Sequence, residues 1–160
     1  MTSSASSDRQ GLVSHLERAR SDLHGSIQGL SDEQLTQRGA VGEWSVKDVL
    51  THVVSWEEMA LPDLARLARG DTPVLQGIDL YATSYDAVNA AIMSLRRDLP
   101  LAQVLRELDI SRGDFMAAVA LLPDPALVEG QFGRVLVQIT AEHDEEHARH
   151  VLEWRKGEGL

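Results

Sequence analysis

Residues 139–151 read ITAEHDEEHARHV, and this stretch near the C-terminus holds three of the chain's six histidines. In a helix, which advances about 100° per residue, His147 lies about 40° and His150 about 20° from His143 around the axis. The same narrow strip includes Leu136, Ile139 and Trp154. Because an apolar strip of this kind normally faces a core, we expect the imidazoles to point inward in a row.

Two of these histidines are spaced as ligands of one metal ion. Side chains at positions i and i+4 of a helix lie one turn apart, so His143 and His147 can reach the same ion. We therefore interpret the rest of the chain as a scaffold that brings a third ligand to this pair.

The length and composition suit one soluble globular domain. The chain has 160 residues, of which 43% are hydrophobic and 25% charged, so we expect a single domain over residues 1–160. Residues 1–7 are serine-rich, lack the apolar core of a signal peptide and are expected to be a frayed start. The absence of cysteine means that any metal site is built from histidine, carboxylate and water.

Several classes of function are excluded by composition. The formal net charge of −10 argues against nucleic-acid binding, which needs a concentrated basic face. No apolar run approaches the length of about 18 residues that spans a membrane. We therefore expect a cytoplasmic protein that acts on a small molecule.

The periodicity of the apolar residues predicts helices throughout. A first helix is expected from about Asp8 to Gly29 and a second from Ser45 to about Gly70, with a kink or break at Pro62. Further helices are expected at 79–98, with Tyr81, Tyr85, Val88, Ile92 and Leu95 inward, at 101–122, and at 132–156, where Gly157 is the expected C-cap.

Two capping boxes mark helix starts within this pattern. Ser31 with Gln34 opens a short helical turn, and Ser45 with Asp48 opens the second helix. No stretch alternates with the period of two that a strand requires. The predicted fold is therefore all-α, a bundle of four main helices with short extra helical turns.

His52 is the best candidate for a third metal ligand. It lies early in the second helix, where Val49 and Trp56 flank it on a partly apolar face. Bundle cores build metal sites from side chains on facing helices. A site of three imidazoles leaves positions open for water or substrate, which is the pattern of catalytic rather than structural sites.

Three segments resemble the DinB/YfiT-like superfamily. Residues 42–57, GEWSVKDVLTHVVSWE, resemble its second-helix signature, and residues 140–147, TAEHDEEH, resemble its last-helix HxxxH motif. The middle of the chain, residues 86–124, is similar to the ClbS/DfsB-type branch and its maleylpyruvate isomerase-like relatives. The resemblance covers nearly the whole chain.

The resemblance implies a four-helix bundle, often a homodimer, with a divalent metal ion, usually zinc or nickel. Carried over to this chain, the metal ligands are His52, His143 and His147. The superfamily includes S-transferases that use mycothiol or bacillithiol, isomerases that depend on glutathione or mycothiol, and a cyclopropane hydrolase that protects its host from a genotoxin. His150 lies outside the matched positions.

Most of the other candidate residues also have a simple structural or surface interpretation. His150 is interpreted as a residue that orients a ligand or as a partly exposed one, and His15 and His24 as surface residues. The acidic run Glu142, Asp144, Glu145 and Glu146 is interpreted as a solvated face. Within it, Glu146 lies about 60° from His143, where it could orient a ligand or accept a proton. Glu57 is a weaker candidate for such a role, and Trp44 and Trp56 fit core packing. Tyr81 and Tyr85 could donate to a substrate, but their spacing of four fits core packing equally well.

The sequence leaves three hypotheses for function. The first is an enzyme whose metal ion activates a low-molecular-weight thiol, as an S-transferase or isomerase, or water, as a hydrolase, against a small electrophile. No GxSxG motif, cysteine nucleophile or phosphate-binding glycine loop offers another route. The second is a binding or self-resistance protein that sequesters a small molecule or metal without turnover. The third is a partner-binding bundle with structural histidines.

Overall fold

The computed structural model describes residues 2–77 and 85–160, and it contains eight helical segments within those ranges. They are α1 (Thr2–Ile27), α2 (Asp32–Thr36), α3 (Val46–Ala68), the 3₁₀ turn η1 (Leu75–Gly77), α4 (Tyr85–Arg96), α5 (Leu101–Ala120), the 3₁₀ turn η2 (Asp124–Leu127) and α6 (Phe132–Glu158). The described residues form no strand, only an isolated bridge between Val41 and Trp44. The all-α prediction is confirmed.

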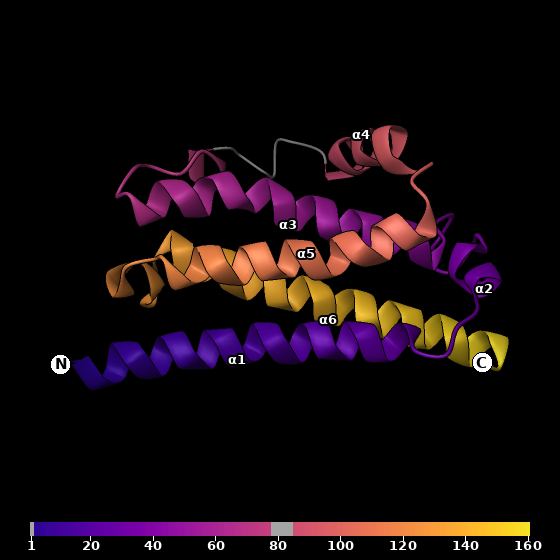
Figure 1. Ribbon diagram of the computed structural model, residues 1–160, viewed down its shortest axis with the longest axis horizontal. Coiled ribbons are helices and arrows are strands. Elements are labelled where there is room, and N and C mark those ends of the chain that lie inside the picture. Colours follow the sequence, from indigo (N-terminus) through magenta and orange to yellow (C-terminus); the bar gives the residue numbers. More distant parts are fainter. Residues whose placement is uncertain (1, 78–84) are drawn as a thin grey trace.

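Four long helices form the bundle, and α4 lies outside it. α1 packs chiefly on α6, and α3 packs chiefly on α5. The members of each pair run in the same direction, because the connection from α3 to α5 returns along the length of the bundle (Figure 1). α4 is part of that connection and lies beside α3. Among the described residues, no helix combines the length and apolar character needed to cross a membrane.

Both predicted capping boxes are present. The Ser31 hydroxyl accepts a hydrogen bond from the Gln34 backbone N–H at 3.2 Å, and the Gln34 side chain accepts from the Ser31 N–H at 2.8 Å. Ser45 and Asp48 exchange the equivalent bonds at 3.1 and 3.0 Å. Each pair satisfies two backbone groups that a helix start leaves without partners, which fixes where α2 and α3 begin.

Some helix boundaries differ from the prediction. α1 begins at Thr2 rather than near Asp8; the prediction that residues 1–7 are frayed stays a prediction, since their side chains lie outside the described part of the structure. α3 continues through Pro62 without a break, because packing of the helix on both sides of the proline outweighs one lost hydrogen bond. α6 ends at Glu158, and Gly159, whose φ is 73°, is the left-handed C-cap that was expected at Gly157.

The third predicted helix ends at Arg96 rather than Asp98, and its described part packs less than expected. Ile92 is buried as predicted, but Leu95 is 83% exposed and Tyr85 is 48% exposed. Both errors have one cause: α4 lies against the outside of the bundle, so only a narrow face of it is covered. Tyr81 and the start predicted at Asp79 lie outside the described residues.

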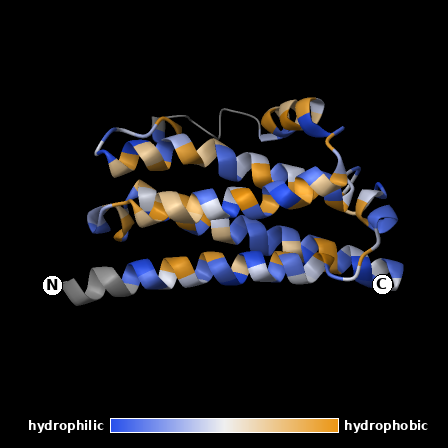
Figure 2. Cartoon of the chain, viewed as in Figure 1, coloured by the Kyte–Doolittle hydropathy of each residue, from blue (hydrophilic) through white to orange (hydrophobic). Residues whose placement is uncertain are grey.

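The hydrophobic core is divided into two clusters. One contains Leu12, Leu16, Ala60, Leu64, Phe115, Val119 and Val137 among others, and the second contains Leu23, Val46, Leu50, Val54, Val104, Leu108 and Val151 among others. Between them along the helices lie four buried charged residues, Arg20, Glu57, Arg112 and Asp144. Figure 2 shows hydrophobic and hydrophilic bands alternating along each long helix, as expected of helices with one buried face.

Candidate metal centre

The three histidines predicted as ligands lie together between α3 and α6. The Nε2 atom of His143 lies 2.8 Å from Nε2 of His52 and 3.0 Å from Nε2 of His147. One nitrogen of each residue lies within 4.8 Å of those of the other two, so the group could hold a metal ion. His52 is 5% exposed and His147 is 8% exposed. The centre is therefore both compact and largely shielded from water.

The spacing of these nitrogens is close to what a tetrahedral metal ion requires. With metal–nitrogen bonds of about 2.0–2.1 Å, two ligand nitrogens of a tetrahedral zinc site lie about 3.3 Å apart. The two printed contacts, 2.8 and 3.0 Å, are slightly shorter. A small outward rotation of the rings would make room for an ion, so the residues present fit a divalent metal.

The imidazoles are held in the neutral form, which is the form that binds metals. Burial disfavours the charged ring and lowers the pKa of His52, His143 and His147 from 6.5 to about 3. For each of the three residues, a neighbouring imidazole of the group also disfavours the charged form and lowers the pKa further. The site therefore offers three unprotonated nitrogens at neutral pH.

These lowered pKa values predict an acid sensitivity of the metal-free protein. An unfolded histidine has a pKa near 6.5 and the folded ones titrate near 3, so the unfolded chain binds more protons between these limits. The free energy of unfolding should fall as the pH falls through that window, by up to about 2 kcal/mol per histidine between pH 7 and pH 5. Denaturant titrations of chelator-treated protein at the two pH values measure this.

The same titrations of two variants identify the source of the loss. His147→Ala should lose less stability between pH 7 and pH 5 than the parent. His24→Ala, in which an exposed ring beside Asp109 is removed, should lose as much as the parent. An unchanged free energy of unfolding in the parent would contradict the prediction.

A cavity of about 390 Å³ extends from the three imidazoles between α3, α4 and α6. Its apolar wall consists of Val53, Ala60, Leu75, Phe132, Leu136 and Ile139. Ile139, which was predicted to face a core, is 55% exposed at this cavity. The strip of α6 that begins in the core therefore becomes the wall of a pocket where it reaches the histidines.

An aromatic and amide group forms the opposite side of the cavity. The ring centroids of Trp56 and Tyr85 lie 5.8 Å apart, and Trp56 donates a hydrogen bond from Nε1 to Oδ1 of Asn89 at 3.0 Å. Trp56 thus lies beside the histidines in the cavity wall, where the sequence had suggested core packing. Trp44 packs on the other side of His52, with its ring centroid 5.2 Å away.

The acidic run around the histidines divides into exposed and buried residues. Glu142, Glu145 and Glu146 are exposed as predicted, but Asp144 is 1% exposed, so the solvated-face interpretation is wrong there. Glu146 borders the cavity, and one of its oxygens lies 3.9 Å from Nε2 of His150. His150 is partly buried and lies outside the group of three, as expected.

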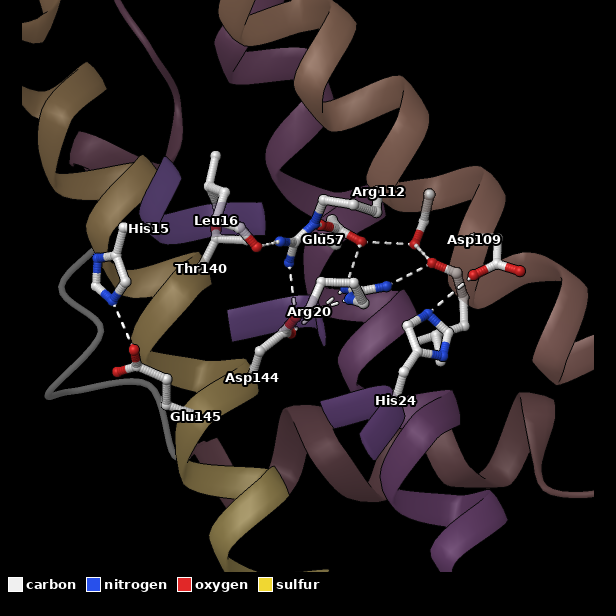
Figure 3. Close-up of polar contacts among 12 residues, drawn as sticks. His15, Leu16, Arg20, His24, Glu57, Asp109, Arg112, Thr140, Asp144 and Glu145 are labelled. Atoms are coloured by element: carbon white, nitrogen blue, oxygen red, sulfur yellow. Dashed lines mark hydrogen bonds and ion pairs between the residues drawn. The ribbon is translucent and has the colours of Figure 1, made fainter. Parts of the chain in front are cut away.

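Asp144 belongs to a buried network of four charged residues, one from each bundle helix (Figure 3). Its carboxylate accepts hydrogen bonds from Nε of Arg20 at 2.7 Å and from an Nη of Arg112 at 2.8 Å. Glu57 accepts from the same two arginines at 3.1 and 2.6 Å, and from Ser111 at 2.6 Å. Burial raises the pKa of Asp144, and the two arginines oppose that shift.

The sequence contains a signal for this network in the spacing of its charged residues, which was not among the predicted features. Each of its members lies three or four residues from a buried apolar residue of the same helix, as Arg20 does from Leu16 and Arg112 from Leu108. A charged residue on an apolar strip of a helix is unusual. Two buried arginines and two buried carboxylates together predict that the opposite charges form ion pairs. Glu57 and Asp144 also line the cavity, so the network forms part of its floor.

Together these features define a helical bundle with a histidine cluster, able to hold a metal ion, at the base of a cavity between helices. The chain belongs to the DinB superfamily, whose family model matches residues 15–151, a range that includes all three histidines. It is similar to an uncharacterized protein, YuaE, of Bacillus subtilis (strain 168), with 28% identity over 130 residues, 78% of this chain and 76% of that protein. No solved structure gives a significant match.

Proposed function

We propose that this chain is a divalent-metal-dependent enzyme that uses a thiol or water against a small electrophilic substrate. The ion, zinc or nickel, would be held by His52, His143 and His147. The observation that carries the proposal is the convergence of three neutral Nε2 atoms on the base of a cavity of about 390 Å³. Open coordination positions facing a cavity are typical of catalytic metal sites.

The ion would supply Lewis acidity, which favours the deprotonated form of a thiol or water at neutral pH. The protein's own residues divide the remaining tasks. Glu57 and Asp144 each accept hydrogen bonds from two arginines, so both carboxylates are engaged in the buried network. Glu146, with a side chain 56% exposed at the cavity edge, is the carboxylate placed to accept a proton and pass it to solvent.

The cavity wall supports a neutral, largely apolar substrate. The described residues that line it include no lysine or arginine, whereas Glu146 adds a negative charge at the edge. A thiol that carries carboxylates would find no cationic side chain there. Mycothiol, which has no carboxylate, would meet less repulsion from Glu146 than glutathione or bacillithiol, which carry carboxylates.

The test is turnover of a panel of electrophiles, such as epoxides and activated aryl halides, by metal-loaded and chelator-treated protein. Each is assayed without thiol and with mycothiol, bacillithiol or glutathione. We expect metal-dependent consumption of one substrate class, fastest with mycothiol. Metal-dependent turnover that no thiol alters would select hydrolysis, and no turnover in any combination would contradict the enzyme proposal.

One observation favours the alternative of a binding or self-resistance protein. Among the described lining residues, both buried carboxylates, Glu57 and Asp144, are paired with two arginines each. Such a cavity could sequester a small molecule without turnover. A bound ligand that is recovered unchanged after long incubation would support this alternative. The proposal also includes a homodimer, which light scattering in solution tests.

A further inference from the structure

Two buried polar atoms on α3 lack hydrogen-bond partners, and they belong to residues one helical turn apart. They are Oδ1 of Asp48 and Nδ1 of His52. Each residue is only 5% exposed, so water does not readily replace the missing partner. A buried polar atom without a partner costs about 1–3 kcal/mol. Such an atom at a candidate site points to a state of the protein in which it is paired.

The positions of the two residues favour a contact between them. Side chains at i and i+4 of a helix are neighbours and lean towards its N-terminus, so His52 leans over the turn that carries Asp48. The second carboxylate oxygen of Asp48 is held by the Ser45 backbone N–H at 3.0 Å. That bond fixes the carboxylate in place and leaves Oδ1 available.

One tautomer of the metal-free histidine group leaves this bond unmade. Two neutral imidazoles whose Nε2 atoms lie 2.8 Å apart, as in His52 and His143, share one proton between those nitrogens. When His52 carries it, Nδ1 of His52 has a lone pair rather than a hydrogen, and it cannot donate to Asp48. Binding through Nε2 requires the opposite tautomer, with the proton on Nδ1.

We propose that Asp48 is a positioning residue for His52: its Oδ1 accepts the Nδ1 proton and thereby holds Nε2 free to bind the ion. This inference rests on the metal site proposed above. Histidines that bind metals commonly donate their other N–H to a carboxylate, and loss of that partner typically weakens metal affinity by about 10- to 100-fold. Asp48 thus joins the helix start to the metal centre.

The test compares the zinc affinities of the parent, Asp48→Asn and Ser45→Ala, measured by competition with a chromophoric chelator. Asp48→Asn should bind zinc about 10- to 100-fold more weakly, because the amide cannot accept from both Ser45 and His52. Ser45→Ala is the matched control: it removes the other half of the capping box but keeps the carboxylate. We expect its affinity to stay within about twofold of the parent.

Three affinity results are decisive. Equal affinities of the parent and Asp48→Asn would overturn the inference and leave the metal site standing. Equally weakened zinc affinities in Asp48→Asn and Ser45→Ala would also overturn the inference, because Asp48 would then act only by capping the start of α3. A parent that binds no zinc, nickel or iron would overturn the metal site and this inference together.

A second measurement uses the parent alone and so does not depend on the folding of a variant. In the zinc-loaded parent, nitrogen-15 NMR should find a His52 ring proton on Nδ1 that exchanges slowly with water. The His52 ring is identified through its proximity to the Trp44 ring. A freely exchanging Nδ1 proton, or one on Nε2, would overturn the inference.

Discussion

An Asp144→Ala variant is expected to lose about 3–5 kcal/mol of folding free energy, the cost of breaking a buried ion pair by removing one partner. For a chain of this length, a loss of that size lowers the melting temperature by about 6–20 °C. Thermal or denaturant unfolding of the metal-free variant beside the metal-free parent measures it. Chelation of both proteins keeps metal binding from contributing.

The reason for the size of the effect is the balance of charge inside the bundle. Two arginines face two carboxylates, and all four side chains are less than a tenth exposed. Without Asp144, Arg20 and Arg112 share Glu57 alone, and one positive charge remains buried without a counterion. Arg20 also donates to the carbonyl oxygen of Leu108, which does not neutralise it.

The adjacent residue on α6 provides a matched control. Glu145 is exposed and contacts His15 at 2.7 Å on the surface. Glu145→Ala should therefore lose no more than about 1 kcal/mol. Equal losses in the two variants would contradict the proposed role of the network, since the effect would then reflect only a change on α6.

Replacing the whole network tests the same argument from the opposite direction. A variant with apolar residues at all four positions leaves no charge buried without a partner. It should recover most of the stability that Asp144→Ala loses, because well-packed apolar side chains replace buried ion pairs at little cost. A quadruple variant less stable than Asp144→Ala would indicate that the network stabilises the bundle beyond neutralising its own charges.

The parts of the structure that the sequence predicted are those set by local patterns. The capping boxes at Ser31 and Ser45 depend on residues three apart, and His143 and His147 depend on helical spacing. The proximity of His52 to that pair, across 91 residues, came from the resemblance to a family rather than from the spacing. All of these placements agree with the structure.

The parts that the sequence did not predict depend on contacts between distant segments. Arg20 and Asp144 are separated by 124 residues, and although each lies on an apolar strip, its sequence neighbours do not show which charge it meets. The exposure of Leu95 and Tyr85 likewise follows from the position of α4 outside the bundle, and no local sequence pattern determines that position. In both cases the packing of helices, rather than helix propensity, decided burial.

A His143→Ala variant is expected to lose near-stoichiometric binding of zinc or nickel while it retains its helicity. Apparent binding free energies of about 10–16 kcal/mol for four-ligand zinc sites correspond to about 2.5–4 kcal/mol per ligand. Loss of one ligand should therefore weaken binding by about 60- to 700-fold. Elemental analysis of protein purified without a metal-affinity tag, together with circular dichroism, measures both quantities.

His150→Ala is the matched control for this variant, because it removes a histidine from the same helix that is not one of the three predicted ligands. The His150 ring lies beside His147, with ring centroids 5.6 Å apart, and its Nε2 faces Glu146. The metal content of the His150→Ala variant should equal that of the parent. If the His143→Ala variant bound as much metal as the parent, the ion would have to bind at another site. Equal loss in both variants would mean that the site extends along α6 to His150, either as a fourth ligand or as a residue that orients His147.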